Sequence, residues 1–285
     1  MVLDFRRAQT ADSVILEALA RRAYSVYEPR MKQTPSPILE NYSATIESSQ
    51  VWISEENGKP VGLIVLIPEG NVMLLGNIAV HPEAQNRGIG STLLTFAELQ
   101  AIKQEMTALR LYTNEAMTEN IAYYSRRGFS ETHRAVHEGR SRVFFHKQLP
   151  TGTGALVWRF YNELWNRWDD SAVDDILADE FAFRGTLGVE TRTPDGWRSY
   201  RDMIRHGSSD FHNKLIELVV DEPRAAARLL YSGHHDGTLA DMPATGKKFE
   251  YAGAAFFTAR ENKLASAWVL GDLSSLRRQL DSQEH

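Results

Sequence analysis

Two apolar segments with different spacing flank a short turn in the first half of the chain. Residues 72–80 are apolar almost throughout, which is typical of a buried strand, and His81-Pro82 then marks a turn. From Ile89 to Ala97 the apolar residues recur at positions i, i+4, i+7 and i+8, the spacing of an amphipathic helix. The pattern therefore predicts a strand, a turn and a helix in succession.

The turn itself reads Gln85-Asn86-Arg87-Gly88-Ile89-Gly90. A glycine-containing turn at the start of a helix presents unpaired backbone N–H groups and the positive end of the helix dipole, and both favour phosphate. No Gly-Lys-Ser/Thr follows, so the turn is not a P-loop. A tight connection whose glycines serve packing alone stays open as an alternative.

The following residues extend the alternation of strands and helices. Residues 108–113 predict a short buried strand and residues 117–126 a helix, after which Gly128 suits the C-terminal cap. Residues 141–147 predict a last strand before the composition changes. The first half of the chain is thus expected to be an α/β domain.

With these motifs in order, residues 1–149 resemble the GNAT family of N-acetyltransferases. In that family a Q/R-x-x-G-x-G/A turn holds the pyrophosphate of acetyl-CoA, and Gln85, Gly88 and Gly90 match it. A later signature is matched by Asn120, Tyr124 and the pair Gly128-Phe129. The resemblance implies a mixed central sheet flanked by helices. It also implies that acetyl-CoA is bound by Ile78, Ala79, Val80, Gln85, Arg87, Gly88, Ile89, Gly90, Ser91 and Asn120.

The resemblance also assigns a catalytic role to Tyr124, which would protonate the departing CoA thiolate. A phenol with an ordinary pKa near 10 suits that role, although a tyrosine packed under the helix with a satisfied hydroxyl is the alternative. Tyr123 lies on another helix face and is expected to be core. Many relatives carry a glutamate before the turn that deprotonates the amine, whereas this chain reads Leu74-Leu75-Gly76-Asn77 there. Catalysis without a protein base, or cofactor binding with little turnover, both remain open.

The chain changes character at residues 150–154, where proline and two glycines surround threonines and predict a flexible, exposed linker. We therefore expect domains at residues 1–149 and 155–285. In the second, Ser171 is expected to cap a short helix, and Thr193-Pro194 to open a longer one reaching about residue 206. Four strands are predicted at residues 213–220, 224–236, 247–259 and 263–272, joined by short turns as antiparallel neighbours.

Helices followed by long hairpins favour an α+β cone with a pocket between its layers. Residues 155–282 resemble the SnoaL-like polyketide cyclase family, which has the NTF2-like fold. The matching segments are residues 160–166, 233–237, 243–248 and 276–280, together with Trp268 and Asp272. The resemblance implies a small-molecule pocket, which in this superfamily serves an enzyme in some members and a binding module or dimer in others.

Two residues of this half are candidates for chemistry. Asp272 shares strand parity with Leu264, Trp268 and Leu270, so it faces the interior if these large residues do. The resemblance then makes Asp272 a general acid/base, and His235 a residue that binds or polarises a carbonyl; His234 is expected to face water. The alternatives are that Asp272 caps the following turn and that His235 is a hydrogen-bonded core residue.

Composition narrows the classes of function. The 285 residues carry a net charge of −5, which gives no reason to expect nucleic acid. There are no cysteines, so disulfides and thiolate chemistry are excluded, and we expect no metal. The apolar runs are too short for a signal peptide or membrane span, which favours a cytoplasmic protein without membrane partners. A homodimer is also an expectation.

The resulting hypothesis is an acyltransferase that moves an acetyl group from acetyl-CoA to an amine of a small molecule or peptide, with a small-ligand pocket appended. One alternative is a cyclase or isomerase that uses Asp272 beside a non-catalytic first half. Another is a ligand-sensing protein with two domains and no catalytic activity.

Overall fold

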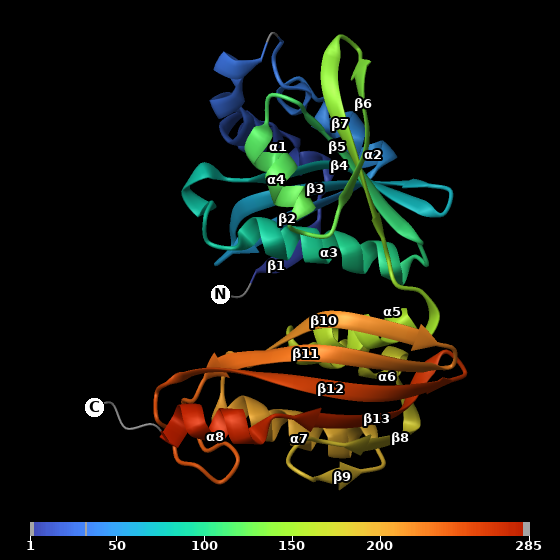
Figure 1. The fold of residues 1–285 in the computed structure, drawn as a ribbon. Helices are drawn as coiled ribbons and strands as arrows, with labels where there is room; N and C mark the ends of the chain where they lie inside the picture. Colours follow the sequence, from blue (N-terminus) through green and yellow to red (C-terminus); the bar gives the residue numbers. More distant parts are fainter. Residues whose placement is uncertain (1–2, 32, 282–285) are drawn as a thin grey trace. The chain divides into compact units, whose positions relative to one another are not determined.

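The computed structural model describes residues 3–31 and 33–281 (Figure 1). The chain divides into two compact units, residues 1–149 and 150–285, which are described separately below. Both the α/β unit and the α+β unit expected from the sequence are present. None of the helices in the described ranges has the length and hydropathy required to cross a bilayer.

The first unit is built on a seven-stranded sheet in the order β1-β2-β3-β4-β5-β7-β6. Neighbouring strands are antiparallel except for β4 and β5, which run parallel. The strands are β1 (Asp4–Arg7), β2 (Gln50–Glu56), β3 (Lys59–Glu69), β4 (Val72–Val80), β5 (Ala108–Asn114), β6 (Ser130–His137) and β7 (Arg140–Gln148).

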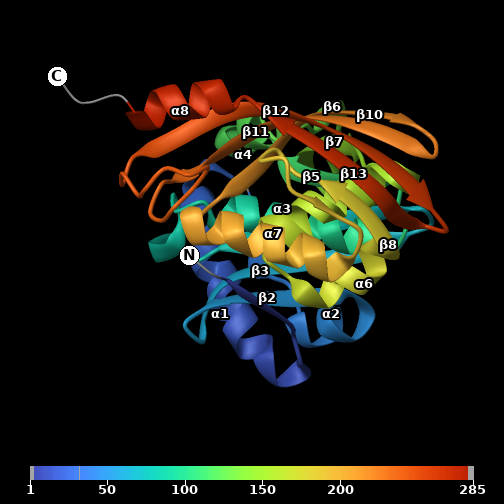
Figure 2. The same cartoon turned by 90° about the horizontal axis from the view of Figure 1, so that it is seen from below.

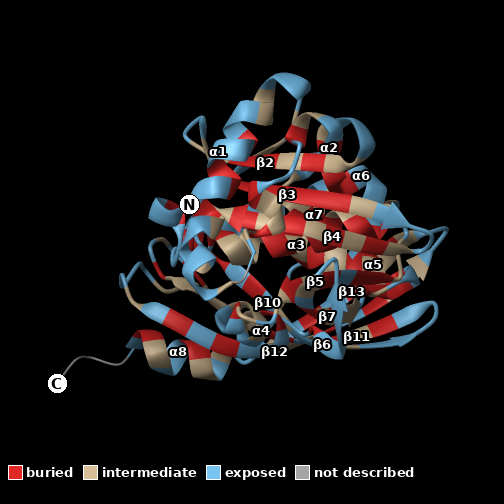
Figure 3. Ribbon diagram, turned by 90° about the horizontal axis from the view of Figure 1, so that it is seen from above, coloured by how far each residue is buried: buried red, intermediate tan, exposed pale blue. Residues whose placement is uncertain are grey.

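Helices cover both faces of this sheet: β3 has a continuous buried run, whereas β4 alternates between buried and intermediate residues, as the colours of Figure 3 show. One face packs on α1 and α2 through residues such as Leu63 and Val65, and α3 packs against β3, β4 and β5. The helices are α1 (Ser13–Tyr24), α2 (Tyr42–Ser48), α3 (Ile89–Lys103) and α4 (Thr118–Ser125). Short 3-10 turns are η1 (Thr10–Asp12), η2 (Ser25–Arg30), η3 (Ser36–Ile38) and η4 (Pro82–Ala84).

The second unit has a six-stranded sheet in the order β10-β11-β12-β13-β8-β9. The four long predicted strands are confirmed, and adjacent ones pair antiparallel. The strands are β8 (Leu177–Arg184), β9 (Glu190–Thr191), β10 (His212–Asp221), β11 (Arg224–His234), β12 (Lys248–Arg260) and β13 (Lys263–Gly271).

The helices of this unit pack on its sheet, α5 against β10 to β13, α7 against β8 and α8 against β12 (Figures 1 and 2). Between them lies a core made largely of aromatic rings. The helices are α5 (Gly152–Arg159), the π-helical η5 (Phe160–Trp165), η6 (Asp170–Ala172), α6 (Val173–Ile176), α7 (Pro194–Gly207) and α8 (Leu273–Asp281).

Two local expectations were wrong. Residues 150–154 are not an exposed linker, because α5 begins at Gly152 and Thr153 is buried. The backbone N–H and hydroxyl of Thr153 both donate to the carboxylate of Glu222, which fixes the start of that helix. Ser171 is not the cap: Asp169 accepts the backbone N–H of Ser171 at 3.0 Å and caps η6 instead. Thr193 does cap α7, as predicted.

Candidate functional site

The turn before α3 adopts two left-handed backbone conformations. Gly88 is the N-terminal cap residue with φ of +83°, and Asn86 has φ of +60°. Glycine adopts this region without a steric penalty, and asparagine is among the few other residues that tolerate it. The local sequence thus explains why the chain reverses here and leaves β4 to enter α3.

This turn leaves backbone donors available. Among the described residues, no hydrogen bond occupies the amides of Gly88, Ile89 and Gly90, and no atom lies within 4 Å of the position that a Cβ on Gly88 would take. The predicted set extended further, but the amide of Ser91 donates to the carbonyl of Gly88 at 3.0 Å. Arg87 directs its guanidinium to Glu56 at 2.5 Å. Of the predicted residues 87–91, Ser91 therefore does not offer a free amide.

Beside the turn, β4 separates from its neighbour. It pairs with β5 only over Val72–Leu75, and Gly76 is an extra residue in its pairing with β3, a β-bulge. Beyond the bulge, the alternation of an antiparallel ladder directs the polar backbone groups of Ile78 and Val80 away from β3, toward the open edge. Those of Ala79 point to β3, so they are not available at the open edge.

Side chains close the ends of this open edge. The amide of Gln85 donates to the Val80 carbonyl at 3.1 Å, and the Tyr24 hydroxyl lies 3.1 Å from the Ile78 carbonyl. Gln85 therefore acts on the shape of the turn, as expected, and the N–H groups of Ile78 and Val80 are left facing the opening. An extended amide-containing chain could pair there as an added strand.

Two residues at the mouth of α3 were missed by sequence reasoning. Arg127 contacts the hydroxyl of Ser91, and its guanidinium lies over the ring of Tyr123, 5.1 Å from the centroid. The Tyr123 hydroxyl lies 3.4 Å from where a Cβ on Gly90 would be, and it is buried without a partner among the described residues. Both side chains are therefore beside the free amides. In the sequence, only one feature points to these two residues: they are four positions apart, one helical turn, shortly after Asn120.

Tyr124 projects from α4 into a pocket at the separation of β4 and β5. Its ring packs against Phe129 and Phe145, and burial raises the pKa of its hydroxyl well above 10. This hydroxyl makes no hydrogen bond among the described residues, and the residue lines the pocket. The hydroxyl therefore lacks the partner that a satisfied structural tyrosine would have, but its pKa is higher than the ordinary value expected from the sequence.

The remaining wall of this pocket is polar but contains no base. Asn77 stands beyond the bulge, where its side chain accepts from the Tyr24 hydroxyl and donates to that of Tyr42, both at 2.8 Å. Asn120 also lines the pocket and accepts weakly from Tyr27 at 3.5 Å. The described lining residues include no aspartate or glutamate. The carboxylate missing from the sequence is thus not replaced from elsewhere in the fold.

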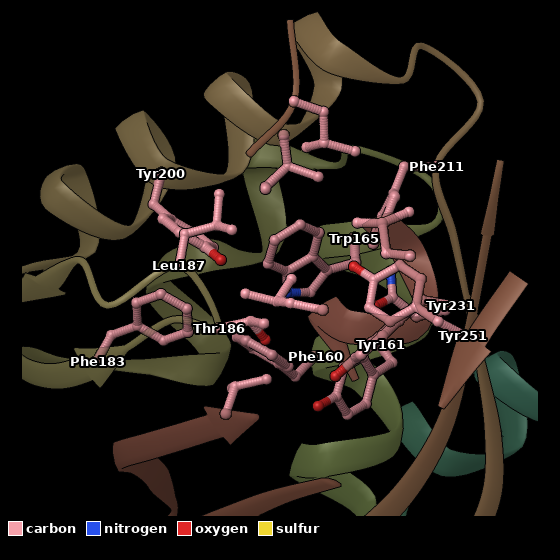
Figure 4. Close-up of a pocket in the computed structure, with 16 residues that line it drawn as sticks. Phe160, Tyr161, Trp165, Phe183, Thr186, Leu187, Tyr200, Phe211, Tyr231 and Tyr251 are labelled. Atoms are coloured by element: carbon pink, nitrogen blue, oxygen red, sulfur yellow. The ribbon is translucent and has the colours of Figure 1, made fainter. Parts of the chain in front are cut away.

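The second unit holds a separate, mostly aromatic cavity (Figure 4). Tyr161, Trp165 and Tyr231 point into it, and the indole N–H of Trp165 is buried there without a partner among the described residues. The hydroxyls of Tyr161 and Tyr231 are within electrostatic range but form no well-aligned hydrogen bond. Burial raises the pKa of both hydroxyls, so they are donors rather than bases at neutral pH.

Asp272 does not face this cavity, and the expected inward orientation is wrong. It is exposed, and its carboxylate accepts the backbone N–H of Ser275 at 2.9 Å, capping α8. The parity argument failed because the large residues face outward: Trp268 and Leu270 are 40% and 43% exposed, whereas Ala267 is buried. The alternative of a cap residue is the correct one.

His235 is fully buried, as its parity indicated, but it does not line the cavity. Its Nδ1 lies 3.0 Å from the Thr245 hydroxyl, and its backbone is bonded to Lys247 and Gly246. Its Nε2 has no partner in the part of the chain that the structure describes. His235 therefore secures the loop after β11, while His234 is partly exposed and pairs with Asp210 at 2.6 Å.

Comparison with known families agrees with both folds. Residues 47–131 match the acetyltransferase (GNAT) domain, and residues 155–280 match the SnoaL-like polyketide cyclase. No curated protein matches the sequence.

Solved structures resemble each half separately. The ribosomal-protein-S18-alanine N-acetyltransferase of Escherichia coli is 17% identical over 53% of this chain and 96% of its own, with a TM-score of 0.42. The PaiA N-acetyltransferase of Thermoplasma acidophilum, solved with coenzyme A, is 20% identical over 52% and 99%, with a TM-score of 0.44. A SnoaL-like polyketide cyclase from Jannaschia is 13% identical over 46% and 93%, with a TM-score of 0.43.

Proposed function

Since the chain joins a GNAT acetyltransferase domain to a SnoaL-like domain, we propose that it transfers the acetyl group of acetyl-CoA to an amine. The observation that carries this proposal is the set of free amides at Gly88, Ile89 and Gly90, at the positive end of a 15-residue helix. A diphosphate is the ligand that such donors favour. Arg127 adds a cation beside them.

The opening between β4 and β5 fits the rest of the same ligand. The pantetheine arm is an extended chain with two amides, and the edge at Ile78 and Val80 offers the matching backbone groups. This edge leads from the turn toward the pocket that contains Tyr124. Acetyl-CoA supplies a thioester, whose C–S bond breaks as the C–N bond of the amide product forms. One proton moves overall from the acceptor nitrogen to the thiol of CoA.

Tyr124 donates a proton, or a hydrogen bond, to the departing sulfur. Its raised pKa keeps the phenol protonated at every physiological pH, so it is always in the form that this role requires. No carboxylate lines the pocket to take a proton from the amine. We therefore propose that the acceptor enters as the neutral amine and loses its proton to solvent after attack.

Two measurements test this proposal. Calorimetric titration with acetyl-CoA should show saturable binding, and the release of CoA thiol should depend on an added amine. Absence of binding at millimolar acetyl-CoA would refute the assignment. Binding without thiol release over a broad amine panel would leave a cofactor-binding protein, the non-enzymatic alternative.

For the second unit we propose a small-ligand binding role rather than a cyclase. The cavity wall offers aromatic rings and the donors of Trp165, Tyr161 and Tyr231, while Asp272 and His235 both lie outside it. Ligand entry should quench the fluorescence of Trp165. A cyclase activity that Asp272→Asn abolishes would refute this proposal and restore the alternative.

The cytoplasmic location and the homodimer stay proposals. Support for a dimer comes from the outward face of β12 and β13, where Phe256 is 54% exposed and its ring makes a tilted contact with that of Trp268. Sedimentation of the wild-type protein and of Trp268→Glu tests it, because the substitution should lower the mass of any dimer formed through this face.

A further inference from the structure

The pocket of the first unit is open to both faces of its sheet. Tyr124 packs on Phe145, which lies on one face of β7. Arg142 stands three residues earlier, on the opposite face, and its guanidinium lies 4.2 Å from the centroid of Tyr112 on β5. Tyr112, Tyr124 and Arg142 nevertheless line the same pocket. The separation of β4 and β5 therefore connects the two faces.

The charged side chains among the described lining residues of the pocket are all positive. Arg140 and Arg142 both line it and share one face of β7, whereas the described lining residues include no carboxylate. Neutral pocket walls around two guanidinium groups make an environment that favours an anion.

The two arginines differ in their hydrogen-bond and ion-pair partners. Arg140 donates to the backbone carbonyl of Thr34 at 3.3 Å, and its Nε is buried without a hydrogen-bond partner. Among the described residues, no aspartate or glutamate lies within 4 Å of it. Arg142 is nearly buried; it contacts the exposed carboxylate of Glu138 at 3.3 Å and His137 Nδ1 at 3.0 Å. Arg140 thus retains a buried donor that nothing in the fold uses.

CoA phosphates do not account for these arginines. The free amides at Gly88 and Gly90 lie at the mouth of α3, together with Arg127. Helix α3 packs on the face of the sheet on which Phe145 contacts Tyr124. Tyr123, the residue next to Tyr124, lies close to Gly90 at the start of α3, which agrees with this placement. Arg140 and Arg142 lie on the other face, beside residues 35–37. The cofactor and the arginines therefore approach the opening from opposite sides.

We infer that the acetyl acceptor is an amine that also carries an anionic group, such as a carboxylate or a phosphate, and that Arg140 and Arg142 bind this group. A planar guanidinium pairs with either anion through two parallel hydrogen bonds. Holding the anion at β7 leaves the amine end to reach the opening beside Asn77. This inference rests on the proposed acetyl transfer for its catalytic consequence, but not for the binding of the anion.

Matched acceptors test the inference through turnover. Glycine is compared with glycinamide, and phosphoethanolamine with ethanolamine, at one pH, and each kcat/KM is expressed per concentration of the neutral amine. The anionic member of at least one pair should have a kcat/KM at least tenfold higher, and the pair that shows it identifies the anion. Equal or better use of both uncharged partners would overturn the inference while leaving the acetyltransferase proposal intact.

Variants separate recognition from folding. Arg140→Gln and Arg142→Gln should each remove at least tenfold of the preference for the anionic member while leaving the Kd for acetyl-CoA unchanged. The control is Arg134→Gln on β6, whose partners are the exposed Glu115 and Glu131; it should keep the preference. Equal losses for both members of a pair, or the same loss in the control, would show a structural role and overturn the inference.

A binding experiment makes the two proposals independently refutable. N-acetylglycine and its amide resemble products and require neither acetyl-CoA nor turnover. Calorimetry on the full chain should show tighter binding of the carboxylate than of the amide by at least tenfold, and Arg140→Gln should abolish the difference. The corresponding pair for phosphate is N-acetylphosphoethanolamine and N-acetylethanolamine. No difference within either pair overturns the inference even if acetyl-CoA binds.

Discussion

Replacing Gly88 by alanine tests whether the mouth of α3 binds acetyl-CoA through its main chain. Gly88 has φ of +83°, a conformation that costs an L-residue about 1–2 kcal/mol. No atom lies within 4 Å of the position that the new Cβ would take. The penalty is therefore conformational, and steric blocking does not confuse the result.

The backbone can respond to Gly88→Ala in two ways. If the turn keeps its shape, the variant loses about 1–2 kcal/mol of stability, or about 3 °C in Tm for each kcal/mol. If it relaxes toward negative φ, the amides of Gly88 and Ile89 rotate away from the ligand. A hydrogen bond to a charged group contributes about 1.5–3 kcal/mol. Loss of one such bond raises the Kd for acetyl-CoA by about tenfold to a hundredfold.

Gly58→Ala is the matched control. Gly58 has φ of +73°, nothing lies within 4 Å of its Cβ position, and it is in the β2–β3 turn. This variant should show a similar loss of Tm with an unchanged Kd. Calorimetry gives the Kd and thermal unfolding gives the strain. If Gly88→Ala keeps the wild-type Tm, which indicates that the strained turn has relaxed, and still binds acetyl-CoA as tightly as Gly58→Ala does, the turn is not a main-chain phosphate site.

Four further predictions concern proton transfer, helix capping and titration. Tyr124→Phe should lower kcat by about a hundredfold without changing the Kd for acetyl-CoA. The wild-type kcat/KM should rise with pH up to the pKa of the acceptor amine. No inflection is expected near pH 4–6, because the described residues that line the pocket include no carboxylate. Such an inflection in a pH–rate series would reveal a base. Asp272→Ala should lower the free energy of unfolding by about 1 kcal/mol. Asp272→Asn should lower it by much less, because an asparagine side chain can also accept the Ser275 N–H and cap α8. Equal losses in chemical denaturation would contradict the capping role. Finally, burial raises the pKa of Tyr161 and Tyr231 above the value of about 10 in the unfolded chain. Their neutral form stabilises the fold fully below that pH and progressively less above it, so Tm should decline from about pH 10 upward, together with the appearance of tyrosinate absorbance.

The turn before α3 was predictable because its determinants are local. A strand, left-handed residues and a helix start follow one another within a few positions, and the residue types alone indicate positive φ at Gly88. The same holds for Thr193, whose side chain caps α7, and for the hairpins of the second unit. Each of these features depends on neighbours in the sequence, which a single sequence displays.

The charged wall of the pocket in the first unit was not predictable in the same way. Arg140 and Arg142 come from β7, Tyr24 from the end of α1 and Tyr124 from α4, so only the order of strands in the sheet brings them together. Alternating polarity in residues 140–146 is typical of an exposed strand face. It does not show that residues 34–37 cover that face. Tertiary contact, rather than residue type, made these arginines part of the site.

One β-bulge explains why strand parity failed for Asp272, and a second one marks the opening in the sheet of the first unit. At Gly76 the extra residue occurs where β4 leaves β5, so it marks the opening used by the proposed ligand. In β13 the pairing shifts around Ala265, which moves Leu264 and Ala267 to the same buried face. A strict two-residue alternation cannot pass through such a point. It placed Asp272 inside the cavity, whereas the bulged strand places it at the cap of α8. A catalytic residue inferred from strand alternation thus requires the register on both neighbouring strands, because one inserted residue exchanges the faces of everything after it.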